Sequence, residues 1–325
     1  MTKRLTVLAT GGTIAGIAGS AIGTEYVAGS IGIDAYLERV GDLDLPAALS
    51  GEQIANVDSG NIGPAVWTPL HAAIVRALAD PECDGIIVTH GTDTLEETAF
   101  LLDLTLPATK PVIVVGAMRP ADAVGYDGLR NFANAVRVAS DVQAGGRGVL
   151  VVMGDRVFGA RDVFKVRTRG AEAFRGVPRE SVALVTPSSC EWFGAPRRHG
   201  EPARFTYTDN LPDVAVLYVH AGLSVETARR LLGPETRGLI VAGVGEGNMP
   251  DPVRSFLAER AATGLRVVRT SRADEGLVDR EGQDTANRFI AGRALNPQKA
   301  RLLLQLLITS GADDVDAMQR AFDSR

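Results

Sequence analysis

Short runs of β-branched and aliphatic residues alternate along the first half of the chain with longer segments whose apolar positions have helical spacing. The apolar runs predict strands at 4–9, 53–57, 86–88, 111–115 and 148–153. The periodic segments between them predict helices at 34–40, 66–78, 94–104 and 127–139. Strands and helices that alternate in this way form a parallel sheet with helices on both faces, so we expect an α/β fold for this part of the chain.

The pattern weakens after the fifth predicted strand and resumes near residue 213. Charges and glycines dominate 156–179, and 194–212 is polar, contains proline and lacks periodicity, as expected of an interdomain linker. A second alternation then predicts strands at 214–219, 238–242 and 265–269, and helices at 224–232 and 252–262. A last long helix is predicted from 296–297, where proline occupies a favoured first-turn position. We therefore expect a larger N-terminal domain at 1–193, a linker at 194–212 and a smaller α/β domain at 213–325.

The stretch around the third predicted strand carries the strongest indication of a functional site. Thr94 and Glu97 have the spacing of a capping box at the start of the following helix. The turn Thr89–Asp93 lies between strand and helix, at the carboxyl end of a strand, where open α/β sheets bind ligands. Backbone amides at a helix N-terminus favour an anion or a developing negative charge. We therefore place a candidate site at this turn.

Polar turns also follow three of the other predicted strands of the first domain. A parallel sheet brings the carboxyl ends of its strands to one edge, so we expect these turns to meet there. Together they supply hydroxyl groups, one carboxylate and many backbone donors. The four turns are Thr10–Thr13, Ser59–Asn61, Thr89–Asp93 and Gly116–Met118.

Residue types alone leave the chemistry of this edge open. A threonine such as Thr13 is a weak nucleophile unless a neighbour takes its proton. Tyr26, in a glycine-rich segment with the composition of a mobile lid, and Lys165 are candidates for that role. Each residue also has an ordinary interpretation: Thr13 and Asp93 as helix caps, Tyr26 as packing, and Lys165 as a surface charge. The pattern indicates a small-molecule enzyme or a binding protein.

Composition and charge exclude several other classes of function. The chain has 325 residues, a net charge of −5 and a pI near 5.5, which does not favour nucleic acid or an anionic membrane as a partner. No secretory signal or membrane-spanning run is visible, and the two cysteines have no metal-ligand spacing, so we expect a cytoplasmic protein with free thiols. The glycine pattern at 11–16 lacks the start of a dinucleotide fingerprint.

Several sequence blocks together resemble the bacterial L-asparaginase family, whose members use a threonine nucleophile. Ala9–Gly16 (ATGGTIAG) and Thr89–Thr98 (THGTDTLEET) resemble its two signature motifs. Three further blocks agree with the family and stand in its order, so that the resemblance covers nearly the whole chain. They are Val115–Pro120 (VGAMRP), Ala242–Gly245 (AGVG) and Leu295–Arg301 (LNPQKAR).

The resemblance implies an amidohydrolase that converts L-asparagine to L-aspartate and ammonia without metal or cofactor. Thr13 would attack the side-chain amide carbon, helped by Tyr26, and Thr92, Lys165 and Asp93 would form a second hydrogen-bonded group. A homotetramer built from intimate dimers is implied, in which the partner chain completes each site.

The resemblance also assigns the substrate pocket. The backbone N–H groups of Gly12 and Thr92 would stabilise the oxyanion, and the Ala117 carbonyl would hold the leaving nitrogen. A second set of residues would bind the amino-acid end of the substrate. Ser59 would take its carboxylate, Asp93 its ammonium, and Asn248 and Glu281 of the neighbouring subunit would complete the pocket.

The sequence departs from the family pattern after Ser59. Secreted, high-affinity members carry Gln or Glu at the next position and then Asp, whereas this chain has Gly60 and Asn61. A side-chain contact to the substrate ammonium at position 60 is therefore missing, and within the family that contact is linked to the handling of glutamine. We expect a preference for asparagine with weak glutaminase activity. Glu246 stands where many members have Asn.

Three alternative functions follow from the same blocks. A glutaminase-asparaginase of broad specificity would keep the mechanism and lose the selectivity. A non-catalytic amino-acid-binding sensor would keep the pocket, but it would be expected to lack Thr13, Tyr26 or Lys165, which are all present. An amidase subunit acting on tRNA would bring a further domain and a basic surface, which are not apparent at a net charge of −5.

Overall fold

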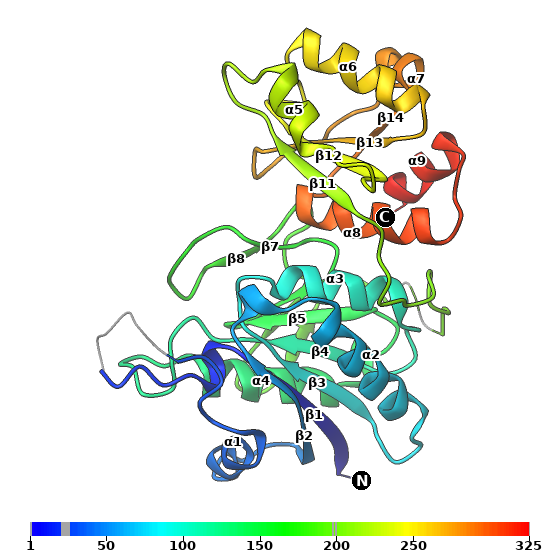
Figure 1. The fold of residues 1–325 in the computed structure, drawn as a ribbon. Coiled ribbons are helices and arrows are strands. Elements are labelled where there is room, and N and C mark those ends of the chain that lie inside the picture. The colour runs from blue at the N-terminus through cyan, green and yellow to red at the C-terminus, as the bar shows by residue number, and fades with distance from the viewer. Residues whose placement is uncertain (1, 21–26, 197, 199, 325) are drawn as a thin grey trace. The chain divides into compact units, whose positions relative to one another are not determined.

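The computed structural model describes residues 2–20, 27–196, 198 and 200–324. The chain divides into two compact units, residues 1–209 and 210–325 (Figure 1). In Figure 1 the first unit runs from blue to green and the second from yellow-green to red. The two-domain α/β fold expected from the sequence is confirmed.

The first unit is built on an eight-stranded mixed sheet with the order β10-β9-β6-β5-β4-β3-β1-β2. Five of its strands are parallel to one another, as predicted. They are β1 (Lys3–Gly11), β2 (Ala47–Val57), β3 (Gly85–Thr89), β4 (Val112–Val115) and β5 (Val149–Met153). The register pairs Leu5 with Gly85 and Ile86 with Val112, so that the carboxyl ends of β1, β3 and β4 lie at one edge.

The remaining strands correct the expectation of a purely parallel sheet. An antiparallel extension follows β5, made of β6 (Arg156–Gly159), β9 (Ala183–Val185) and β10 (Cys190–Trp192). A separate antiparallel pair consists of β7 (Val163–Lys165) and β8 (Phe174–Gly176). These strands are only three or four residues long. Such short strands do not produce a clear alternation of apolar and polar residues, and the sequence pattern therefore missed them.

Helices cover both faces of the first sheet. Helices α1 (Ile33–Val40) and α4 (Gly128–Ser140) pack on one face, against Leu5 and Val7 of β1. Helices α2 (Pro64–Ala79) and α3 (Leu95–Thr105) pack on the other face, against Leu8. Short 3₁₀ turns complete the unit at Thr13–Ala15 (η1), Ser59–Asn61 (η2) and Val142–Ala144 (η3). The alternation of side chains along β1 therefore separates two apolar cores.

The start of α3 differs from the expected capping box. Thr94 occupies the cap position, but its side chain makes no capping hydrogen bond. Its hydroxyl instead donates to the backbone oxygen of Ser59 at 2.8 Å. Spacing alone predicted a local cap, whereas the hydroxyl is used to join two distant turns.

The second unit has a four-stranded parallel sheet with the order β11-β12-β13-β14. The strands are β11 (Val214–Tyr218), β12 (Gly238–Gly243), β13 (Arg266–Ser271) and β14 (Phe289–Ala291). The helices are α5 (Val225–Leu231), α6 (Asp251–Ala262), α7 (Gly282–Asn287), α8 (Pro297–Thr309) and α9 (Val315–Asp323). The sequence pattern did not predict α7, β14 or α9, of which α7 and β14 are the shortest helix and strand of this unit.

The segment at the end of the first unit is attached to α3. The amides of Arg204 and Phe205 donate to the Leu104 oxygen at 3.1 and 3.0 Å, and Arg198 forms an ion pair with Asp103 at 2.7 Å. The division between the units falls at 209/210, within 194–212, and that range stays our predicted linker.

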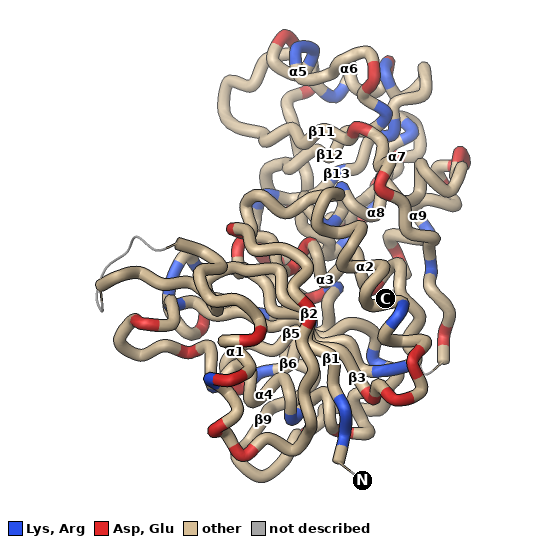
Figure 2. The backbone as a smooth tube through the Cα atoms, turned by 60° about the horizontal axis from the view of Figure 1, so that its bottom comes forward, with Lys and Arg blue, Asp and Glu red and all other residues tan. Residues whose placement is uncertain are grey.

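Charged residues are distributed over both units. Figure 2 shows basic and acidic positions interspersed along the backbone, in keeping with the net charge of −5. Among the described residues, no helix has the length and hydropathy needed to cross a bilayer.

Candidate active site

The strand order of the first unit identifies where a ligand would bind. From β1 the chain moves to β2 on one side and then to β3, β4 and β5 on the other, so the order reverses between β1 and β3. Open α/β sheets bind ligands in the crevice outside the carboxyl ends of the strands at such a reversal. The second sheet runs in sequential order and has no reversal. The turns after β1 and β3 are therefore the expected location of a ligand-binding site.

The turns after β1 and β3 touch through two glycines. Gly12 has a φ of 80°, which favours glycine, and a Cβ atom placed there would lie 2.4 Å from both the Cα and the N of Gly91. This contact is possible only without a side chain at position 12. It brings together the backbone segments that carry Thr13 and Thr92, the residues that directly follow the two glycines.

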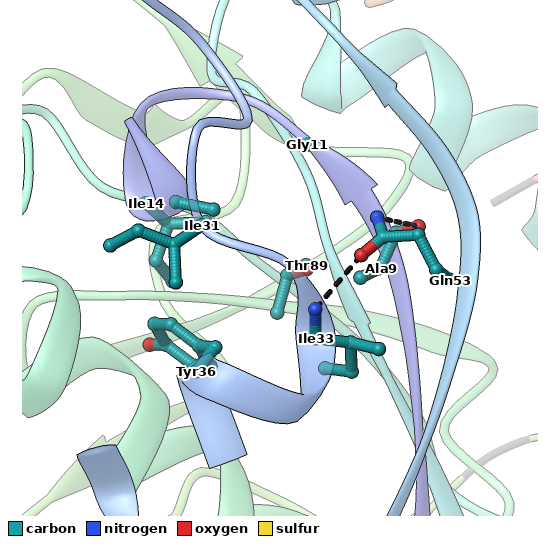
Figure 3. A pocket seen from close by; sticks show the side chains of 9 residues that line it. Ala9, Gly11, Ile14, Ile31, Ile33, Tyr36, Gln53 and Thr89 are labelled. Atoms are coloured by element: carbon teal, nitrogen blue, oxygen red, sulfur yellow. Dashed lines mark hydrogen bonds between the residues drawn. The ribbon is translucent and has the colours of Figure 1, made fainter. Parts of the chain in front are cut away.

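Thr13 begins the 3₁₀ turn η1 and is 6% exposed. A cavity of about 10 Å³, room for roughly one water molecule, lies among the residues around this turn (Figure 3). It is too small for an amino-acid substrate. Beside it the Gln53 side chain accepts from the Ile33 amide at 2.9 Å and donates to the Ala9 oxygen at 3.2 Å. These bonds fix the end of β1 to α1. The lining residues are Ala9, Gly11, Ile14, Ala15, Ile31, Ile33, Tyr36, Gln53 and Thr89.

Lys165, the last residue of β7, reaches the turn after β3. Its ammonium donates to Thr92 Oγ1 at 2.9 Å and forms an ion pair with Asp93. The Lys165 side chain is 14% exposed and that of Asp93 is 63% exposed. The largely buried ammonium of Lys165 therefore connects the Thr92 hydroxyl to a carboxylate that is exposed to solvent.

Ser59 joins the turn after β2 to the same group. Its hydroxyl oxygen accepts from the Asp93 amide at 3.2 Å, and its carbonyl accepts from the Thr94 hydroxyl. Ser59 is 2% exposed, whereas Gly60 and Asn61 are exposed. The Gly60 amide donates to Asp58 Oδ1 at 2.9 Å.

The turn after β4 is held by residues that the sequence analysis did not single out. The Asp127 carboxylate accepts from the amides of Met118 and Arg119 at 3.0 Å, and Asn131 Nδ2 donates to the Gly116 oxygen at 3.0 Å. Ala117 is fully buried between them. Asp127 precedes α4, where an acidic residue is normally expected to cap the helix, so its sequence position gave no indication of this role.

His90 belongs to the turn after β3, where it directly follows the strand, and it is fully buried. Its Nδ1 lies 2.6 Å from the Gly91 oxygen and its Nε2 lies 2.8 Å from Thr98 Oγ1. Burial lowers the pKa of His90 to about 4, against a smaller opposing effect of the Gly91 carbonyl. The histidine is therefore neutral at physiological pH.

The lowered pKa of His90 predicts a loss of stability in mild acid. Unfolding returns the imidazole to a pKa near 6.5, so between about pH 6.5 and 4 only the unfolded chain binds the proton. The contribution of His90 to the free energy of unfolding is complete above pH 6.5. It falls by about 2–3 kcal/mol as the pH approaches 4.5. Urea unfolding at pH 7 and pH 4.5 should show a smaller difference for His90→Asn than for the wild type. The same substitution at the exposed His220 is the control, and equal differences for wild type and His90→Asn would contradict the prediction.

The predicted site has three further residues, Tyr26, Asn248 and Glu281. Tyr26 lies outside the described residues. Asn248 and Glu281 belong to the second unit, where Asn248 is exposed and the Glu281 side chain is 41% exposed. Glu281 caps α7 through a reciprocal pair of bonds with Asp284.

A fully buried arginine organises the loops that carry these two residues. Arg269 binds the buried Asp284 carboxylate with two hydrogen bonds of 2.6 Å. It also donates to the Glu246 oxygen at 2.9 Å and lies 3.6 Å from the Glu281 carboxylate. One cation therefore fixes both the loop before Asn248 and the start of α7.

The structure modifies one part of the predicted oxyanion site. The Gly12 N–H already donates to the Val57 oxygen at 3.0 Å, a bond that the sequence did not reveal. The Thr92 N–H has no hydrogen-bond acceptor among the described residues. Thr92 is therefore the better placed of the two donors. Within the described part of the chain, no cluster of three metal-binding side chains occurs.

Comparison with known proteins gives consistent results over both units. A family profile described as "Asparaginase, N-terminal" matches residues 4–198, and "Glutaminase/Asparaginase C-terminal domain" matches 213–322. L-asparaginase 2 of Escherichia coli K12 is 40% identical over 97% of this chain and 91% of that protein. A Haemophilus influenzae protein named probable L-asparaginase periplasmic is 40% identical over 95% of this chain and 89% of that one. The crystal structure of a probable cytoplasmic L-asparaginase from Campylobacter jejuni has a TM-score of 0.93 at 36% identity, covering 99% and 100% of the two chains.

Proposed function

Because the chain belongs to the asparaginase family of amidohydrolases, we propose that it hydrolyses L-asparagine to L-aspartate and ammonia. The observation that carries this proposal is the group formed by Lys165, Thr92 and Asp93 beside the buried hydroxyl of Ser59. A zwitterionic amino acid needs a carboxylate for its ammonium and hydrogen-bond donors for its carboxylate. Asp93 supplies the first and Ser59 the second, at the reversal point of the sheet.

The reaction takes place in two acyl-transfer steps. Thr13 Oγ attacks the side-chain amide carbon, its proton is passed to the departing nitrogen, and the C–N bond breaks to release ammonia. Water then attacks the resulting aspartyl ester, and L-aspartate leaves as the proton returns to Thr13 Oγ. Tyr26 and the Lys165–Thr92 pair are the candidates for moving these protons.

Negative charge develops on the carbonyl oxygen of the amide in the first step and of the ester in the second. The Thr92 N–H stabilises it, and the Gly12 N–H contributes by sharing its bond with the Val57 oxygen. Donors placed in this way contribute roughly 3–4 kcal/mol each to the stabilisation of a transition state. The Ala117 carbonyl accepts from the leaving nitrogen, and its turn is held in place by Asp127 and Asn131.

Substrate preference is the finer part of the proposal. Asparagine is the preferred amide and glutamine is turned over weakly, because Gly60 offers no side chain to the substrate ammonium. The first experiment is ammonia release from each amide by the wild-type protein and by Thr13→Ala. Fast release from asparagine only, abolished by the substitution, is expected. Comparable kcat/KM for the two amides would overturn the selectivity.

A substitution at Gly60 tests the selectivity directly. Gly60→Gln should raise kcat/KM for glutamine by about tenfold, the effect of one hydrogen bond to a charged group, with a smaller change for asparagine. A Cβ atom at this position would meet only Asp58 Oδ1, at 3.3 Å, so the new side chain fits without displacing backbone. Gly60→Ala is the matched control, since it adds the Cβ without the amide. Equal behaviour of the two variants would contradict the prediction.

Assembly and compartment complete the proposal. A homotetramer of intimate dimers is proposed, in which Asn248 and Glu281 of the partner chain complete each pocket, and sedimentation analysis tests it. We propose a cytoplasmic location, supported by the two free cysteines and by the name of the Campylobacter jejuni relative. The name of the Haemophilus influenzae relative favours the periplasm, so fractionation of the source cells decides between them.

A further inference from the structure

A one-way chain of hydrogen bonds leads from the core to the turn after β3. The Gly91 carbonyl can only accept, so the His90 Nδ1 that lies 2.6 Å away carries the proton. His90 Nε2 therefore accepts from Thr98 Oγ1, and Thr98 Oγ1 in turn accepts from Trp67 Nε1 at 2.9 Å. Each group in this chain donates to the next, ending at the Gly91 oxygen.

The acceptor of this chain belongs to the same peptide unit as the Thr92 N–H. In a trans peptide the carbonyl and the N–H point in opposite directions. A bond that holds the Gly91 oxygen towards His90 therefore directs the Thr92 N–H away from His90. Glycine permits more backbone conformations than other residues, so the peptide that follows Gly91 depends on an external restraint to keep one orientation.

We propose that His90 is a positioning residue that fixes the Gly91–Thr92 peptide, so that the Thr92 N–H faces the oxyanion formed during amide hydrolysis. This inference rests on the proposed function and adds a residue to which the resemblance assigned no role. The Thr92 N–H has no acceptor among the described residues, as a donor reserved for a transient oxygen requires.

The surroundings of His90 favour this role over simple packing. Trp67, Thr98 and His90 are between 0 and 5% exposed and come from α2, α3 and the turn after β3. Polar groups this deeply buried are costly unless every one is paired, and here each of them is. An imidazole kept neutral by burial donates to the carbonyl without placing a positive charge beneath the site.

Two substitutions of nearly equal size separate positioning from packing. In His90→Asn the Nδ2 group stands close to the position of Nδ1 and can still donate to the Gly91 oxygen, whereas His90→Leu has no donor. We expect His90→Leu to lower kcat for asparagine by about 10²-fold or more, with KM within about threefold of wild type. His90→Asn should recover most of that loss. An aldehyde analogue of the substrate side chain, which forms a tetrahedral oxyanion with Thr13, should bind His90→Leu more weakly in proportion to kcat, with the affinity for L-aspartate unchanged.

A substitution of Thr98 provides a second test of the proposal if His90→Leu fails to fold. Thr98→Val has nearly the same shape as the wild-type residue but removes the bond to His90 Nε2, and we expect about a tenfold lower kcat at unchanged KM. Equal kcat for His90→Asn and His90→Leu, or losses confined to KM, would overturn the inference while the proposed function stands. Absence of amide turnover by the wild-type protein would overturn both.

Discussion

Lys165→Met is expected to lower asparagine turnover by about 10³-fold or more while leaving the protein folded. The substitution removes the ammonium that donates to Thr92 Oγ1 and pairs with Asp93, and methionine restores only the apolar stem. The effect on stability should be small, because an ion pair whose carboxylate is 63% exposed contributes about 1 kcal/mol or less. Ammonia release together with thermal unfolding measures the two effects separately.

A double variant tests whether Lys165 and Thr13 act in the same catalytic unit. Residues that act as one catalytic unit have strongly non-additive effects, so Lys165→Met combined with Thr13→Ala should be no slower than the slower single variant. Arg167 is exposed and pairs with Glu172 nearby, so Arg167→Met is a matched control that should retain wild-type turnover. Retention of turnover within about tenfold by Lys165→Met would exclude Lys165 from the chemistry.

Gly12→Ala is expected to have the largest combined effect on stability and activity. The added Cβ would lie 2.4 Å from the Gly91 backbone, so the turns after β1 and β3 would have to separate. We expect a destabilisation of about 4 kcal/mol and turnover below detection. Urea unfolding and ammonia release measure the two consequences.

Gly19→Ala provides the control for this prediction. Gly19 also has a positive φ, of 69°, but a Cβ there would meet nothing within 4 Å. This variant therefore measures the conformational cost alone, about 1 kcal/mol. Similar losses of stability for Gly12→Ala and Gly19→Ala would show that the contact with Gly91 is unimportant.

The sequence predicted the parts of the fold whose signals are local. The run Ile86–Val88 and the periodic segment 66–78 are long or apolar enough to determine a strand and a helix, and both were found within β3 and α2. The turn Thr89–Asp93 was correctly predicted at the edge where the parallel strands have their carboxyl ends, because parallel strands end at the same edge of a sheet. The antiparallel strands β6 to β10 were missed, since their three or four residues are fixed by partners rather than by their own pattern.

The interactions that could not be predicted are those that join distant parts of the chain. Thr94 was expected to cap its own helix but bonds to Ser59, which lies 35 residues away. Asp127 was expected only as the start of a helix, and it holds the turn that contains Ala117. The amide of Gly12 was expected to be available but donates to Val57. Each of these three polar groups could form a hydrogen bond with any of several partners. Which partner lies within reach is determined by the tertiary fold and not by the neighbouring sequence.

The dual use of Ser59 has a consequence for how such enzymes diverge. Its hydroxyl and its carbonyl both join the turns after β2 and β3, so exchanging Ser59 to alter recognition would also weaken the architecture. Gly60 is exposed, and its open side can accept a side chain next to Asp58. A substitution at position 60 can therefore change substrate preference with little effect on the fold. A substitution at position 59 is constrained both by substrate recognition and by the bonds that join the two turns. Relatives with different preferences should differ first at the former position and keep the latter.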